Sequence, residues 1–202
     1  MTEARCERPD GKRSAFLFSI DIDVESPLSW RLGGEAASAL GELEQRRFGM
    51  RQGLPRLLGL LREHGVRASC FVPTADAERH QGALVALVDA GHEVGLHGHH
   101  RERVDALDAA TNTVILDHSL AVFEAQAGVA PRVYRSPAWE LTPELHALLR
   151  ERGLVYDSSL MGYDHPYPLG GLTEIPVEWL TDDAVHLRFR APWREKWPPS
   201  AP

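Results

Sequence analysis

Four of the ten histidines of this chain stand within nine positions, in the segment GHEVGLHGHHRER (residues 91–103). Imidazole nitrogens are common metal ligands, whereas an arginine side chain offers only proton donors. Some of these histidines are therefore candidate metal ligands, but the arginine that directly follows them is not, so which of them hold a metal, if any, has to be decided from the rest of the sequence. Next to arginine and glutamate, such a cluster is also typical of a solvated turn. The residues in order are His92, His97, His99, His100 and Arg101.

Further charged side chains stand at the ends of short apolar runs. Asp21 and Asp23 close the first run, and Arg135 closes the run RVYRS (132–136). Because side chains alternate along a strand, the two aspartates share one face, where a cation or an arginine must offset their repulsion. Functional side chains of parallel α/β folds gather at the carboxyl ends of strands. We therefore expect these three residues and His97 to converge in one cleft.

These residue types suit metal-assisted hydrolysis, which needs fixed ligands, an open position for water and a base. Asp23 and His97 are suitable ligands, and Asp21 is a suitable base if Arg135 keeps it ionised and oriented. Plainer readings remain open. An Asp-x-Asp at a strand end often only begins a loop or caps a helix, Arg135 fits a structural ion pair, and Trp139 fits a core position.

The elements that must position these residues alternate between strand and helix. Thr142 as N-cap, Pro143 at the first helical position and Gly153 beyond the end give the clearest helix. The alternation predicts an α/β fold with a parallel sheet, either open or closed into a barrel. Strands are expected over 15–22, 66–73, 92–97, 132–136, 154–160 and 172–180, and helices over 53–65, 82–91, 107–127 and 141–153.

Bulk composition excludes several classes of protein. The 202 residues are enough for one domain with a core, and 43% hydrophobic with 25% charged residues is ordinary globular composition. A formal charge of −7 argues against a nucleic-acid or anionic membrane surface. Cys6 and Cys70 make no disulfide framework. The first apolar run, AFLFSI (15–20), is too short for a leader or a membrane span, so a cytoplasmic location is expected.

Five segments together resemble one known family. FSIDIDVES, GVRASCFVP, GHEVGLHGHHRER, YRSPAWELTPE and GLVYDSSLMGYDHPY are similar, in this order, to the polysaccharide deacetylases (NodB homology domain, carbohydrate esterase family 4). The closest branch carries Asp-x-Asp and includes peptidoglycan deacetylase-like and allantoinase-like proteins. The resemblance implies a distorted (β/α) barrel of the NodB type over residues 14–190, preceded by a polar segment (1–13) and followed by a Pro/Trp-rich tail (191–202). It implies hydrolysis of an N-acetyl group or a related amide.

The resemblance also implies roles for individual residues. Asp21 matches the catalytic base and Arg135 the arginine that orients it. Asp23 and His97 match metal ligands. Pro137 and Trp139 match residues that shape the substrate groove.

The family's second histidine ligand falls on Arg101 in this chain. Because a guanidinium cannot bind a cation, a divalent metal, zinc first among candidates, is expected to be held weakly or to be absent. His100, one residue earlier, is the nearest replacement ligand. The family's late general-acid histidine motif is also unmatched, since His186 in AVHLRF does not fit its order. The barrel is therefore expected to lack its last strands.

The function predicted from these residues is hydrolysis of a carbon–nitrogen bond in a non-peptide amide, by deacetylation of an N-acetylated sugar or related amide in carbohydrate metabolism. Three alternatives stay open: a metal-independent cyclic amide hydrolase of the allantoinase-like kind, a degenerate sugar-binding domain, and a glycosyltransferase using Asp-x-Asp. The expected partner is a small-molecule or saccharide amide, with no nucleic acid and no membrane. An incomplete barrel would expose edges that a second copy of the chain could cover.

Overall fold

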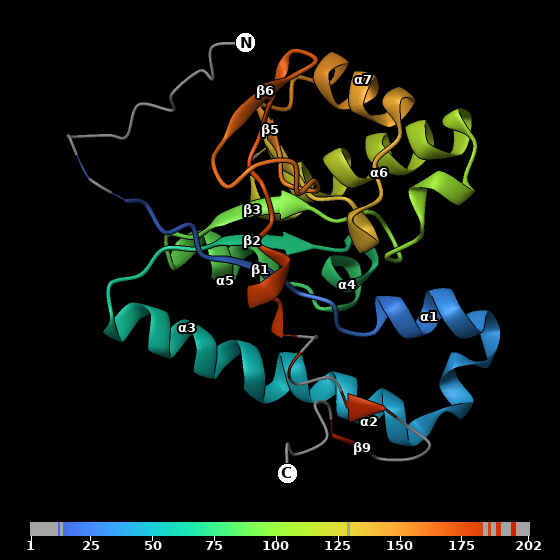
Figure 1. Cartoon of the computed structure of the whole chain (residues 1–202). Coiled ribbons are helices and arrows are strands. Elements are labelled where there is room, and N and C mark those ends of the chain that lie inside the picture. Colours follow the sequence, from blue (N-terminus) through green and yellow to red (C-terminus); the bar gives the residue numbers. More distant parts are fainter. Residues whose placement is uncertain are drawn as a thin grey trace.

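A seven-stranded sheet organises the structure, a computed structural model that describes residues 12, 14–128, 130–183, 186, 189–190 and 195–196. The strand order is β1-β2-β3-β4-β5-β7-β6, and every neighbouring pair is parallel except β6 with β7. β1 and β6 form the two edges, so the sheet does not close into a barrel over the described residues (Figure 1). The strands are β1 (Ser19–Asp21), β2 (Ser69–Val72), β3 (Glu93–Leu96), β4 (Val133–Tyr134), β5 (Tyr156–Asp157), β6 (Tyr167–Leu169) and β7 (Leu172–Glu174).

Helices connect the parallel neighbours β1 to β2, β2 to β3, β3 to β4 and β4 to β5, whereas β5 leads to β7 through β6. α6 packs against α4, α5 and α7, while α1, α2 and α3 lie together below the strands in Figure 1. Strands β8 (Phe189–Arg190) and β9 (Glu195–Lys196) form a second, antiparallel sheet of two strands. The helices are α1 (Ser26–Leu32), α2 (Leu40–Phe48), α3 (Leu54–Glu63), α4 (Thr74–Arg79), α5 (Ala83–Asp89), α6 (Ala109–Ala127) and α7 (Pro143–Glu151).

The four expected helices are present as α3, α5, α6 and α7. In α7 the side chain of Thr142 accepts a hydrogen bond from the Leu145 amide, so it is the N-cap that the sequence predicts. α6 begins after Asp108, whose carboxylate likewise caps the helix by accepting from the Thr111 amide. The parallel α/β fold class is therefore confirmed.

The expected buried strand over 15–22 is wrong in its first half. β1 begins only at Ser19, and the side chains of Phe16 and Leu17 are 84% and 61% exposed. The physical reason is position in the sheet, because in the described part of the chain β1 pairs on one side only, with β2, and no further strand covers residues 15–17. Helices α1, α2 and α4 were not predicted from the sequence. In α1 and α2 only Ser26, Leu28 and Leu43 are buried, and α4 has only six residues.

The core lies between the sheet and its helices, and it holds β2 and β3 most tightly. Cys70, Leu96 and Phe123 are completely buried in it. Gly95 lets β3 approach its neighbours, since a Cβ there would meet the side chains of Phe71 and Val133 at 2.7 Å. This packing fixes the carboxyl ends of the central strands, from which the candidate site is built.

The expected polar segment (1–13) and tail (191–202) fall outside the described residues, apart from residue 12 and Glu195–Lys196. In the part of the chain that the structure describes, no helix combines the length and the apolar character that a membrane crossing requires.

Candidate active site

The carboxyl ends of β1, β3 and β4 bring together Asp21, Asp23, His97 and Arg135. His97 Nε2 lies 3.8 Å from Asp21 Oδ2 and 3.6 Å from Asp23 Oδ1. Arg135 Nη1 donates to Asp21 Oδ1 at 2.7 Å. We call these four residues and Arg101 the strand-end cluster. Their convergence follows from the parallel register, in which Leu96 pairs with Tyr134 beside the β1–β2 ladder.

Arg135 is buried, and all three nitrogens of its guanidinium donate hydrogen bonds. Its Nε donates to the Ser158 carbonyl at 2.8 Å, and Nη2 donates to the hydroxyls of Ser19 and Ser158 at 2.9 and 2.8 Å. Its planar group also lies over the Phe71 ring, 4.2 Å from the centroid. These contacts from four directions leave Arg135 one orientation, so its remaining donor is aimed at Asp21.

His97 is completely buried, and its ring is fixed from behind. Its Nδ1 lies 2.8 Å from the carbonyl oxygen of Arg135, which can only accept, so Nδ1 carries the proton. Nε2 then faces the two aspartates with a lone pair when the ring is neutral, and with a proton when the ring is charged. Among the residues that the structure describes, neither His97 Nε2 nor Asp23 Oδ1 has a hydrogen-bond partner, although both atoms are buried. An unpartnered imidazole nitrogen that faces an unpartnered carboxylate oxygen is an arrangement that a bound cation would satisfy.

Arg101 contacts Asp23 at the carboxylate oxygen that does not face His97. Its Nε contacts Asp23 Oδ2 as an ion pair, and its backbone has a φ of +61°, a left-handed conformation that is unfavourable for arginine. A guanidinium supplies no lone pair, so the residues present do not fit a metal held by three protein ligands. The His100 ring, the expected replacement, packs against the His99 ring with centroids 4.1 Å apart.

The electrostatics of Asp23 reflect this crowded setting. Desolvation in the cluster raises the pKa of the Asp23 carboxyl, the charge of Asp21 adds to the rise, and positive charge on His97 and Arg101 opposes it. Arg101 therefore provides a balancing charge where a carboxylate would otherwise be costly to ionise.

The loop after β4 carries the two residues matched to the substrate groove. Pro137 is buried against the loop after β3, because a Cβ on Gly98 would lie 3.0 Å from the Pro137 ring. Trp139 is half-buried and has a φ of +62°. Among the described residues, the non-glycine positions with positive φ are Arg101, Ala138 and Trp139, all in the loops that follow β3 and β4. Such backbone strain concentrates at functional sites.

Asp76 was missed by the sequence analysis, yet it holds the chain directly after Asp23. Its buried carboxylate accepts from the backbone amides of Val24, Glu25 and Ser26 at 2.9 to 3.2 Å. No local signal distinguishes it, because its partners are about fifty residues away in the chain. Asp76 therefore positions the Asp23 segment without touching the cluster's reactive groups.

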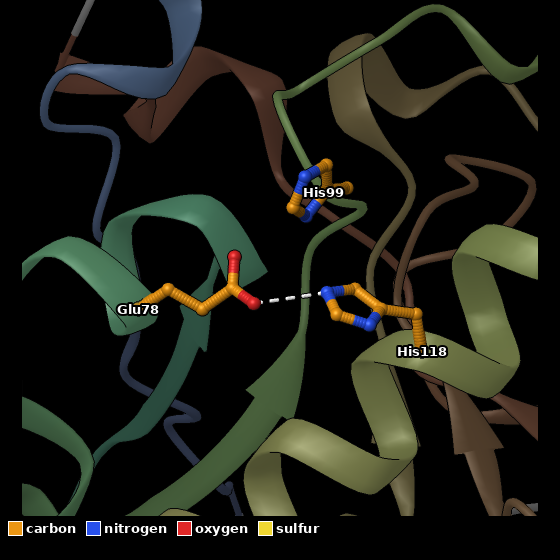
Figure 2. A group of neighbouring side chains, drawn as sticks. All are labelled: Glu78, His99 and His118. Atoms are coloured by element: carbon orange, nitrogen blue, oxygen red, sulfur yellow. Dashed lines mark hydrogen bonds and ion pairs between the residues drawn. The ribbon is translucent and has the colours of Figure 1, made fainter.

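The other histidines of the segment 91–103 have separate surroundings. His92 Nδ1 accepts from the Ala68 amide at 3.2 Å, which is a structural contact between β2 and β3. His99 lies beside Glu78 of α4 and His118 of α6 (Figure 2). The ligand atoms of these three lie within 4.8 Å of one another, so they could hold a metal ion. None of them is among the predicted ligands. His186 lies elsewhere, with Nε2 3.1 Å from the Leu180 carbonyl oxygen.

Comparison with known proteins identifies the family. The family model "Polysaccharide deacetylase" matches residues 48–156. The peptidoglycan deacetylase of Helicobacter pylori is 30% identical over 206 residues, covering 88% of this chain and 70% of that protein. A crystal structure of a Mycobacterium smegmatis protein assigned as a polysaccharide deacetylase is 38% identical, with a TM-score of 0.88 over 93% of this chain and 67% of its own.

The fold extends to a more distant structure. The Puue allantoinase is 23% identical and superposes with a TM-score of 0.72, covering 84% of this chain and 63% of its own. This likeness concerns the fold alone. The chain belongs to the polysaccharide deacetylase family, and it has a NodB-type α/β fold whose barrel is not closed over the described residues.

Proposed function

We propose that this chain hydrolyses a carbon–nitrogen bond in an N-acetylated sugar or related amide, with Asp21 as the base. The observation that carries the proposal is the setting of Asp21. One carboxylate oxygen accepts from the fixed Arg135 at 2.7 Å, and the other lies 3.8 Å from His97. A carboxylate oriented by a buried arginine, at the carboxyl end of a parallel strand, is suited to accept a proton.

In the proposed reaction Asp21 takes a proton from a water molecule while the water oxygen bonds to the amide carbonyl carbon. Negative charge then develops on the carbonyl oxygen, and positive charge in the cluster stabilises it. The carbon–nitrogen bond breaks, and protonated Asp21 returns the proton to the leaving amine. The products are a carboxylic acid, which releases its proton to water to become the carboxylate, and a free amine. No step is assigned to a metal, because Arg101 stands where a third ligand would be needed. We propose that a divalent metal is held there weakly or not at all.

Acetate release from N-acetylglucosamine oligomers tests this proposal. The unmodified chain should release acetate, and Asp21→Asn should lower kcat at least 100-fold while KM changes only a few-fold, since the base acts in the chemical step. Asp89→Asn, at an exposed position at the end of α5, is the matched control and should keep full turnover. Unchanged kcat in Asp21→Asn would contradict the assigned role.

A metal-independent hydrolase of cyclic amides is the second candidate, favoured by the contact of Arg101 with Asp23. It predicts turnover of a five-membered cyclic ureide or imide that survives dialysis against a chelator. Oligosaccharide binding without release of acetate, and without turnover of the cyclic amide, would instead indicate a sugar-binding domain. The two substrates tested side by side therefore separate the three readings.

A further inference from the structure

One carboxylate and two imidazoles from three separate elements converge outside the strand-end cluster (Figure 2). Glu78 comes from α4, His118 from α6 and His99 from the loop after β3. His118 Nε2 lies 3.0 Å from Glu78 Oε1, and the His99 and His118 rings meet edge to face with centroids 5.2 Å apart. Two histidines and one glutamate are a ligand set that zinc accepts readily, with a fourth position left for water.

The backbone of His99 is fixed, which makes its ring a defined component. Its amide donates to Glu102 Oε1 at 2.8 Å, and its carbonyl accepts from the Ala75 amide of α4 at 3.0 Å. Within this fixed loop, His99 Nδ1 is buried and has no hydrogen-bond partner in the described part of the chain. A buried nitrogen without a partner, beside a carboxylate and a second imidazole, points independently to a ligand.

The other two side chains can complete the geometry. The ligand atoms lie within 4.8 Å of one another, whereas bonds of about 2.0–2.1 Å to a tetrahedral zinc ion place ligand atoms about 3.3 Å apart. Closing these separations by up to about 1.5 Å needs only side-chain rotation, because Glu78 and His118 are 39% and 45% exposed and lie on helix surfaces. His99 needs no backbone change.

We propose that Glu78, His99 and His118 form a zinc-type metal site distinct from the strand-end cluster. A metal there would join α4 and α6 to the loop that carries both His97 and Arg101, and would hold that loop in place. The proposal does not depend on amide hydrolysis. One histidine of the segment 91–103, His99, would then bind a metal at a site that does not include position 101.

A plain ion pair between His118 and Glu78 is the competing explanation. An exposed pair of this kind contributes little to stability and requires no metal. It leaves the buried Nδ1 of His99 unsatisfied, whereas a metal would satisfy it. The two explanations differ in whether all three residues bind one cation.

Isothermal titration calorimetry with zinc alone, on the full chain, tests the site. The unmodified chain should bind zinc, and both His118→Ala and Glu78→Gln should weaken that binding at least tenfold. His64→Ala, at an exposed histidine after α3, controls for loss of a surface histidine. Asp23→Asn controls for binding at the strand-end cluster. Both controls should keep the affinity of the unmodified chain.

Thermal unfolding gives a second readout, since a ligand that binds the native state raises Tm. Zinc should raise the Tm of the unmodified chain and of both controls, and should leave that of His118→Ala unchanged. Three results would overturn the proposal: no zinc binding by the unmodified chain, equal binding by His118→Ala, or loss of binding in Asp23→Asn with retention in His118→Ala. Acetate release is not measured, so failure here leaves the proposed hydrolysis untouched.

Discussion

Arg101 contacts Asp23 at the position where the family resemblance places a histidine beside a metal-binding carboxylate. A cation bound between Asp23 and His97 would therefore meet a like charge. At about 4 Å and an effective dielectric near 20, one such unit-charge pair costs about 4 kcal/mol, and a divalent ion roughly doubles it. The positive charge of the Arg101 guanidinium balances the Asp23 carboxylate, as a metal ion would otherwise do. Either the Arg101 guanidinium or a divalent metal ion can therefore balance the charge of Asp23, but the two do not fit beside it together.

Replacing this arginine should create a metal site. Arg101→His removes the like charge and adds a lone pair, so zinc should bind the strand-end cluster at least tenfold tighter, about 1.4 kcal/mol. The measurement is zinc titration in a His118→Ala background, which removes the second proposed site. Arg103→His, at the exposed arginine two residues later, is the control and should add no zinc affinity. Equal affinities of the two variants would show that Arg101 does not limit metal binding.

Arg135 should not tolerate even a conservative substitution. Lysine keeps the charge but cannot reach Asp21, Ser19 and Ser158 together, so buried acceptors lose their donors. We expect Arg135→Lys to lower the free energy of unfolding by about 2–4 kcal/mol and kcat at least tenfold. Urea denaturation and acetate release measure the two effects. Arg152→Lys, in the half-exposed pair with Asp117, should cost below about 1 kcal/mol. Similar losses in both variants would contradict the special role of Arg135.

The parts of the fold that depend on local chemistry could be predicted from the sequence. Thr142 and Pro143 identify the start of α7 because capping involves only neighbouring residues. The meeting of Asp21 with His97 and Arg135 could be predicted because parallel strands end at one edge of a sheet. In both cases the prediction needs only a general rule, for helix capping or for the ends of parallel strands, and not the tertiary structure itself.

Other parts depend on contacts that no local pattern encodes. α1 and α2 bury few residues, so their hydrophobic periodicity is weak. The grouping of Glu78 with His99 and His118 requires the packing of α4 against α6 and the path of the loop after β3. The exposure of Phe16 follows from the edge position of β1, which depends on the order of strands in space.

Asp76 should stabilise the structure far more than an ordinary buried carboxylate. Asp76→Ala leaves three backbone amides at the start of α1 without an acceptor, so we expect a loss of about 3 kcal/mol in the free energy of unfolding. Asp76→Asn keeps one acceptor oxygen and should lose about half as much. Urea denaturation of both variants, with Asp89→Asn as control, measures this. A loss below about 1 kcal/mol in Asp76→Ala would show that water satisfies these amides.

Glu174 should make stability depend on pH. Its side chain is fully buried beside Asp157, and desolvation, followed by its interactions with Asp157, raises its pKa to about 9; burial also raises the pKa of Asp157. In the unfolded chain Glu174 has its ordinary pKa of 4.5. Between these values the folded state binds a proton that the unfolded state has released. Stability from this group is therefore fully present below the unfolded pKa and falls as pH rises, by at most about 1.4 kcal/mol per pH unit.

Glu174→Gln removes the titrating group while its amide can still donate to Asp157. The variant should gain stability over the unmodified chain as pH rises, and its free energy of unfolding should vary less between roughly pH 5 and 8.5. Urea denaturation at several pH values in that window measures the slope. Glu63→Gln, at the exposed end of α3, should keep the slope of the unmodified chain. If Glu174→Gln kept that slope too, the buried carboxyl would not be protonated in the folded state, and the Asp157–Glu174 contact would have to be stabilised by something other than a shared proton.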